Sequence, residues 1–201
     1  MSKSRVLNID YSLAPEHPFH KALEDSFNIY NWLLSIGILS ENIIMGGDSS
    51  GGGLVLATLI KLRDSEISLP IAAFFLSPWI DLALKGKSMK TKQNSDPMVN
   101  KEILEFASKL YLNNTDPMNT LASPLYANLK GLPHLFIQVG TSEILLDDSI
   151  RLAHQAESDG VKVDLRTWND MIHVFGLLES NIPEVQQANK ELIGFIKQYF
   201  Q

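Results

Sequence analysis

Residues 46–53 read GGDSSGGG and lie between two apolar runs, IIM at 43–45 and LVLA at 54–57. Five glycines in eight residues, between a strand-like and a helix-like segment, indicate a backbone that closely approaches another group. Three groups would explain such a turn: a phosphate, a dinucleotide, or the carbonyl of a substrate that Ser49 attacks. Which of these groups the turn approaches decides which fold the sequence predicts.

The two phosphate-binding patterns do not fit this stretch. A P-loop needs lysine and then serine or threonine after its last glycine, and Leu54 stands there instead. A dinucleotide loop needs G-x-G-x-x-G, and reading from Gly46 or Gly47 places Asp48 or Ser49 at the second glycine. The turn is therefore not predicted to bind a nucleotide.

The pattern that fits is G-x-S-x-G, in a strand–turn–helix context that is typical of a nucleophile elbow. Its members are Gly47, Asp48, Ser49, Ser50 and Gly51. The turn is tight, so the residues two before and two after the serine must be small. The N–H of Ser50, at a helix N-terminus, is then expected to point at a developing oxyanion. A glycine-rich turn without chemistry is the alternative.

Apolar runs alternate with helix-period segments along the chain. Strands are expected at residues 5–11, 42–46, 71–77, 135–139 and 161–167, and helices at 20–36, 51–62, 148–158 and 183–200. This alternation predicts an α/β fold with a mostly parallel sheet and helices on both faces.

One stretch, between Trp79 and Leu135, carries no strand pattern. It holds a lysine-rich polar loop at 85–97, whose four lysines are expected to be solvated rather than to form an anion site, and a helix at 101–112. We interpret the stretch as an insertion over the carboxyl edge of the sheet.

A nucleophilic serine needs a base, and the base needs an acid; in this fold the chain order is serine, acid, histidine. His173, in the loop NDMIHVF after the last strand, is the expected base. The other four histidines do not fit the base. His17 and His20 precede Ser49, and His154 lies within a helix. His134 lies at the start of its strand, at the edge of the sheet opposite the one where the site is expected.

The acid is expected just after the strand at 135–139, in the segment GTSEILLDDS. Glu143 lies close to the strand end and is the preferred candidate. Asp147 is the alternative, although Asp147 and Asp148 fit better as N-cap and first-turn carboxylates of the following helix.

Composition limits the remaining function classes. The 201 residues are 45% hydrophobic, enough for one domain with a core, and the net charge of -6 argues against a nucleic-acid partner. Cysteine is absent, no apolar run approaches the roughly 18 residues of a membrane span, and the first ten residues lack a signal-peptide core. We therefore expect a cytoplasmic protein with a small-molecule substrate and without a metal or other cofactor.

Three stretches resemble the hormone-sensitive-lipase-like branch of the α/β-hydrolases, the GDSAG esterases. They are GGDSSGGGL (46–54), similar to the family's GDSAGG elbow; NIDYSLAPEHPFHKALED (8–25), similar to DYRLAPEHPFPAALED; and GTSEILLDD (140–148) followed by MIHVF (171–175). The resemblance covers essentially the whole chain. It implies a carboxylic ester hydrolase of short or medium acyl esters with a triad of Ser49, Glu143 and His173. The family's usual acid is an aspartate, so the glutamate is a departure.

One family feature has no counterpart in the chain. Family members carry an HGGG loop upstream of the DYRLAPE stretch, and its N–H groups complete the oxyanion hole; the chain contains no HGGG. The strand before that loop lies, in the family, between those matching residues 5–11 and 42–46. The resemblance thus implies one incomplete domain over 1–201, with a partial cap insertion at about 82–121. We expect impaired activity and exposed edges that favour self-association. A catalytically inactive hydrolase-like binding module is the alternative.

Overall fold

The computed structural model describes residues 4–178 and 181–200. Four strands form one parallel sheet in the order β1-β2-β3-β4. Their bounds are β1 (Ile44–Asp48), β2 (Ala72–Leu76), β3 (His134–Gly140) and β4 (Val163–Trp168). All four carboxyl ends therefore lie at one edge of the sheet, and the predicted parallel α/β architecture is confirmed.

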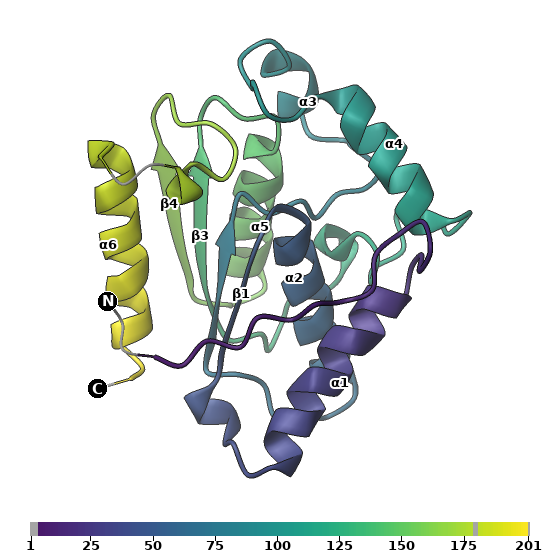
Figure 1. The fold of residues 1–201 in the computed structure, drawn as a ribbon, viewed down its shortest axis with the longest axis vertical. Helices are drawn as coiled ribbons and strands as arrows, with labels where there is room; N and C mark the ends of the chain where they lie inside the picture. Colours follow the sequence, from purple (N-terminus) through teal and green to yellow (C-terminus); the bar gives the residue numbers. More distant parts are fainter. Residues whose placement is uncertain (1–3, 179–180, 201) are drawn as a thin grey trace.

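Helices cover both faces of the sheet (Figure 1). On one face lie α2 (Ser49–Asp64) and α5 (Leu146–Ser158), with α1 (Lys21–Ser35) packed on α2. The other face carries α6 (Pro183–Lys197). Side chains alternate between the two faces, as expected for strands: Phe75 and Ile137 pack towards α2 and α5, and Phe136 packs towards α6.

The stretch between β2 and β3 contains no strand, as expected. It folds into α3 (Ser88–Thr91), α4 (Lys101–Leu112) and the 3₁₀ turn η2 (Pro124–Tyr126). The predicted polar loop is thus partly helical, although Lys85, Lys87 and Lys90 are exposed. Buried Met89 packs in one cluster with Ile144, just beyond the end of β3, so this stretch is fixed against the loop that follows β3.

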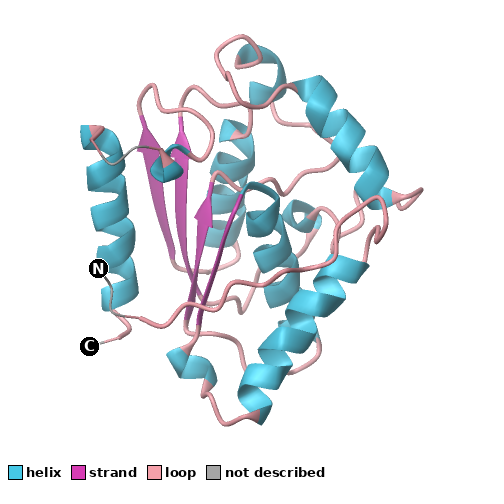
Figure 2. Cartoon of the chain, viewed as in Figure 1, coloured by secondary structure: helices cyan, strands magenta, loops and turns pink. Residues whose placement is uncertain are grey.

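The strand predicted at residues 5–11 is wrong. The segment is extended but belongs to no ladder, and Figure 2 draws it as loop. A strand needs a partner that it pairs with, and no described strand pairs with this segment. Val6 is consequently 87% exposed. β1 remains an edge of the sheet, with Gly46 and Asp48 exposed.

Other predicted bounds differ by a few residues. The helix expected from residue 51 begins at Ser49, so the serine opens the helix. The last helix ends at Lys197 rather than at 200. Two further 3₁₀ turns, η1 (Ser40–Asn42) and η3 (Phe175–Leu177), complete the described elements. Within the described ranges no helix is long and apolar enough to cross a membrane.

Candidate active site

Four polar side chains follow the carboxyl ends of the four strands. Ser49 directly follows β1, Ser77 directly follows β2, Glu143 lies three residues after β3, and His173 lies five residues after β4. Parallel strands place these positions at one edge, where crevices form in open α/β sheets. The fold therefore brings together residues that are up to 124 positions apart in the sequence.

Ser49, His173 and Glu143 form one hydrogen-bonded chain. Ser49 Oγ lies 2.9 Å from His173 Nε2, and His173 Nδ1 lies 3.0 Å from Glu143 Oε2. Glu143 is fully buried and His173 is 4% exposed. A hydroxyl beside one imidazole nitrogen and a carboxylate beside the other can activate the hydroxyl for nucleophilic attack.

The turn that carries Ser49 is tight on one side only. Ser49 has φ 49°, a left-handed conformation that is uncommon outside glycine. A Cβ on Gly47 would lie 2.4 Å from the backbone carbon and oxygen of Gly51. A Cβ on Gly51 would have no heavy atom within 4 Å apart from its chain neighbours and the backbone of its own helix. The expectation that both flanking positions must be small therefore holds for Gly47 and is wrong for Gly51.

Gly47→Ala and Gly51→Ala form a matched pair of variants with opposite expected effects. Gly47→Ala forces the elbow open and should destabilise the fold by a few kcal/mol, as backbone overpacking does. Gly51→Ala adds a helix-favouring residue in open space inside α2 and should stabilise by about 0.5–1 kcal/mol. Urea unfolding of both variants measures the difference. Equal destabilisation of the two variants would contradict this account of the turn.

A second set of contacts fixes Glu143. Its Oε1 accepts hydrogen bonds from the Gly140 N–H at 2.7 Å and from the Ser77 hydroxyl at 2.8 Å. The same Ser77 oxygen accepts the Val174 N–H at 3.0 Å. No motif of the sequence gives Ser77 a role. The signal that points to it is its place as the polar last residue of the apolar run IAAFFLS at 71–77, where a strand is predicted.

Gly140 lets the histidine loop approach the end of β3. A Cβ there would lie 2.0 Å from the carbonyl oxygen of Met171. The Ser142 N–H donates to that same oxygen at 3.0 Å, which ties the loop that carries Glu143 to the loop that carries His173. Glu143 and His173 are thus held in contact through the backbones of their loops as well as through their side chains.

Asp147 and Asp148 lie in the first turn of α5, as expected, but the expected N-cap role is wrong, because Leu145 holds that position and no side chain caps the helix. Asp147 Oδ2 accepts the N–H groups of Lys87 and Ser88, and Asp148 Oδ2 accepts those of Ile80 and Asp81. The segment 80–88 packs on this turn and offers its own free N–H groups to the carboxylates. The structure accordingly places Glu143, and not Asp147, at His173.

Complete burial raises the pKa of Asp148 to about 8, and the nearby Asp81 carboxylate adds to this, whereas the two backbone hydrogen bonds lower it. The folded protein then keeps this proton up to about pH 8, while an unfolded chain with the ordinary pKa of 3.8 loses it near pH 4. The contribution of Asp148 to the free energy of unfolding should therefore fall as the pH rises from about 4 to about 8. Asp148→Asn should flatten this slope in urea unfolding, whereas Asp170→Asn, at an exposed position, should not. Parallel slopes for wild type and Asp148→Asn would disprove the linkage.

The other histidines lie away from this chain of residues. His17 and His154 are exposed, and exposed His20 pairs with Glu24 at 3.2 Å. His134, at the start of β3, lies 3.0 Å from an Asp164 carboxylate oxygen and 2.5 Å from the Tyr199 hydroxyl. Burial lowers the pKa of His134.

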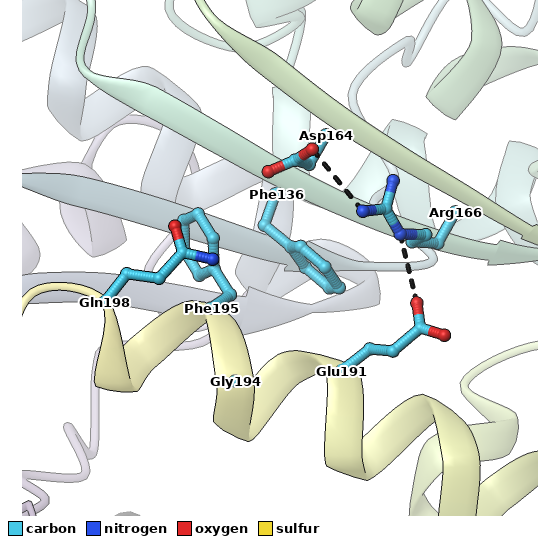
Figure 3. A pocket seen from close by; sticks show the side chains of 7 residues that line it. All are labelled: Phe136, Asp164, Arg166, Glu191, Gly194, Phe195 and Gln198. Atoms are coloured by element: carbon cyan, nitrogen blue, oxygen red, sulfur yellow. Dashed lines mark hydrogen bonds and ion pairs between the residues drawn. The ribbon is translucent and has the colours of Figure 1, made fainter.

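A cavity of about 300 Å³ lies between α6 and the strands β3 and β4, and Ser49 is not among the residues that line it (Figure 3). Its charged residues already pair with one another: Arg166 lies 3.0 Å from Glu191 and 3.5 Å from Asp164. The guanidinium is therefore not free to hold an anion. Across residues 4–178 and 181–200, no three histidine, aspartate or glutamate side chains form a group that could hold a metal ion.

Comparisons with known proteins show the family to which this fold belongs. A family model described as an alpha/beta hydrolase fold matches residues 1–177. An esterase of Acinetobacter venetianus is 36% identical over 96% of this chain and 64% of its own length, and an acetyl-hydrolase of Streptomyces hygroscopicus is 38% identical over the same shares. A crystal structure of an esterase from the bacterial hormone-sensitive lipase family is 45% identical, with a TM-score of 0.93, over 96% of this chain and 65% of that one. The chain spans slightly less than two thirds of each of these three proteins.

Proposed function

We propose that this chain, which belongs to the α/β-hydrolase fold family and is similar to its hormone-sensitive-lipase-like esterases, is a serine hydrolase of carboxylic esters. One observation carries the proposal: the hydrogen-bonded chain from Ser49 through His173 to buried Glu143, with distances of 2.9 Å and 3.0 Å. The names of the similar esterase and acetyl-hydrolase support an ester substrate. We propose short or medium acyl chains.

In the proposed mechanism Ser49 Oγ attacks the acyl carbon while His173 Nε2 takes the hydroxyl proton. The tetrahedral intermediate collapses, the bond to the alcohol breaks, and His173 returns the proton to the leaving alcohol oxygen. Water then attacks the acyl carbon and gives one proton to the same nitrogen. The second tetrahedral intermediate collapses, the bond between the acyl carbon and Ser49 Oγ breaks, and His173 returns the proton to Ser49 Oγ as the carboxylic acid leaves. Glu143 holds the imidazole in the required tautomer and stabilises the imidazolium.

The oxyanion would be stabilised first by the N–H of Ser50. This residue lies in the first turn of α2, where N–H groups have no acceptor within the helix and the dipole favours negative charge. Two or more donors are usual for a tetrahedral oxyanion, and no HGGG loop occurs in the sequence. We therefore propose an impaired rate for this chain.

The segment at about 82–121 is proposed to act as part of a cap over the acyl pocket. The exposed edge of β1 is the proposed site of self-association.

The second candidate function is non-catalytic: a hydrolase-like binding module that keeps the three residues without a working oxyanion site. The exposed Ser50 and the absence of an HGGG loop favour it. Covalent labelling of Ser49 by a fluorophosphonate separates the two candidates, because the reagent reacts with an activated serine and leaves an ordinary one untouched.

A further inference from the structure

We propose that Ser77 is a positioning residue of this site: its hydroxyl locks the acid Glu143 and the loop of the base His173 into one geometry. The inference rests on the proposed function and deepens it, because it names a fourth side chain on which the reactivity of Ser49 depends. The Ser77 hydroxyl bonds Glu143 and the Val174 N–H rather than Ser49, so it acts on the nucleophile through Glu143.

The hydroxyl of Ser77 has one proton, and both of its roles as donor and acceptor are used. It donates to Glu143 Oε1 at 2.8 Å and accepts the Val174 N–H at 3.0 Å. Ser77 is 1% exposed, so water does not replace either bond readily. Val174 directly follows His173, and the second bond therefore fixes the backbone beside the base.

The contacts divide the two oxygens of Glu143 between different tasks. Oε1 takes the donors of Ser77 and Gly140, which leaves Oε2 for His173 Nδ1. Without the Ser77 donor only the Gly140 N–H would oppose rotation of the carboxylate. The hydroxyl thus selects the orientation in which Oε2 faces the imidazole.

The backbone around the site also points to this role. Ser49, Ser77 and Val174 have φ values of 49°, 48° and 47°, which non-glycine residues seldom adopt and which are least favourable for a β-branched residue. Such conformations persist where surrounding contacts over-determine them, and they concentrate at functional sites. The Ser77 hydroxyl accepts the N–H of Val174 directly. It is connected to Ser49 through Glu143 and His173.

A purely structural alternative makes a different prediction. If position 77 needed only a left-handed turn, glycine would serve better than serine, because glycine adopts φ 48° without steric cost. Ser77→Gly therefore relieves the backbone and removes the hydroxyl, whereas Ser77→Ala keeps the backbone cost and removes the hydroxyl. Ser108→Ala is the matched control: Ser108 is also buried, and its hydroxyl donates to the Leu82 carbonyl away from the site.

The test combines proton NMR with the rate of fluorophosphonate labelling. The wild type should show a low-field resonance of the His173 Nδ1 proton, assigned through its loss in His173→Gln. We expect this resonance to broaden or vanish in Ser77→Gly and Ser77→Ala and to persist in Ser108→Ala. Labelling of Ser49 should slow by roughly 10- to 100-fold in both Ser77 variants, the scale of a displaced catalytic group.

The two readouts separate this inference from the proposed function. Ser77→Gly that keeps the resonance and labels at the wild-type rate would overturn the inference. Absence of the resonance from the folded wild type would overturn it as well. A wild type that shows the resonance, loses it in Ser77→Gly and yet is never labelled would leave Ser77 as a positioning residue and refute the hydrolase function.

Discussion

A fluorophosphonate probe should label the purified protein on Ser49, and the Ser49→Ala variant should not be labelled above background. Phosphonylation of a serine needs a base at the hydroxyl, and His173 Nε2 lies 2.9 Å from Ser49 Oγ. The base in turn is oriented by Glu143 at 3.0 Å. Removal of a member of such a triad lowers reactivity by roughly 10⁴- to 10⁶-fold. The label should be located by peptide mass spectrometry.

Three controls make the labelling result specific. Ser35→Ala removes an exposed serine at the end of α1, whose hydroxyl donates to the Trp32 carbonyl, and this variant should label like the wild type. His173→Ala should be unreactive although its serine is intact. Circular dichroism of each variant shows that the fold is kept. A folded wild type that stays unlabelled would refute the enzyme proposal and favour the binding module.

Extension of the chain at its N-terminus with a strand and an HGGG loop from one of the resembled esterases should raise the rate of ester hydrolysis by at least roughly 10²–10³-fold. That range is the usual effect of a single oxyanion donor. Two features of the fold favour the gain: β1 is an edge strand with Gly46 and Asp48 exposed, and residues 5–11 pair with no strand in the part of the chain that the structure describes. A new strand beside β1 would place its loop next to Ser50.

The gain must be tied to backbone donors rather than to better folding. The same extension with prolines at two of its loop glycines keeps the chain length but removes two N–H groups, so it should lose most of the gain. Ser49→Ala in the extended protein should abolish hydrolysis. If the extended, folded protein is no faster than the chain alone, the impaired-oxyanion account is incorrect.

Local patterns predicted most of the architecture. Strand and helix periods follow from neighbouring residues, and β2, β3, β4 and α4 lie close to where the sequence placed them. The elbow could be predicted for the same reason. Glycine is needed at position 47 because a Cβ there would meet the backbone of Gly51, only four residues further along the chain. The strand predicted at residues 5–11 is wrong because a strand forms only when a second segment pairs with it. The apolar pattern of one segment does not show whether that partner is present.

The sequence by itself determined the parallel α/β class, the serine on its turn, and the order in which a serine, carboxylates and a histidine follow successive strands, because these depend on short-range sterics and periodicity. Only the tertiary structure decided which carboxylate meets the histidine. Glu143 and Asp147 are four residues apart, and packing of segment 80–88 against α5 draws Asp147 to the N–H groups of Lys87 and Ser88. The structure alone also revealed Ser77, whose partner Glu143 is 66 residues away. Such contacts depend on how distant segments pack, which no local pattern records.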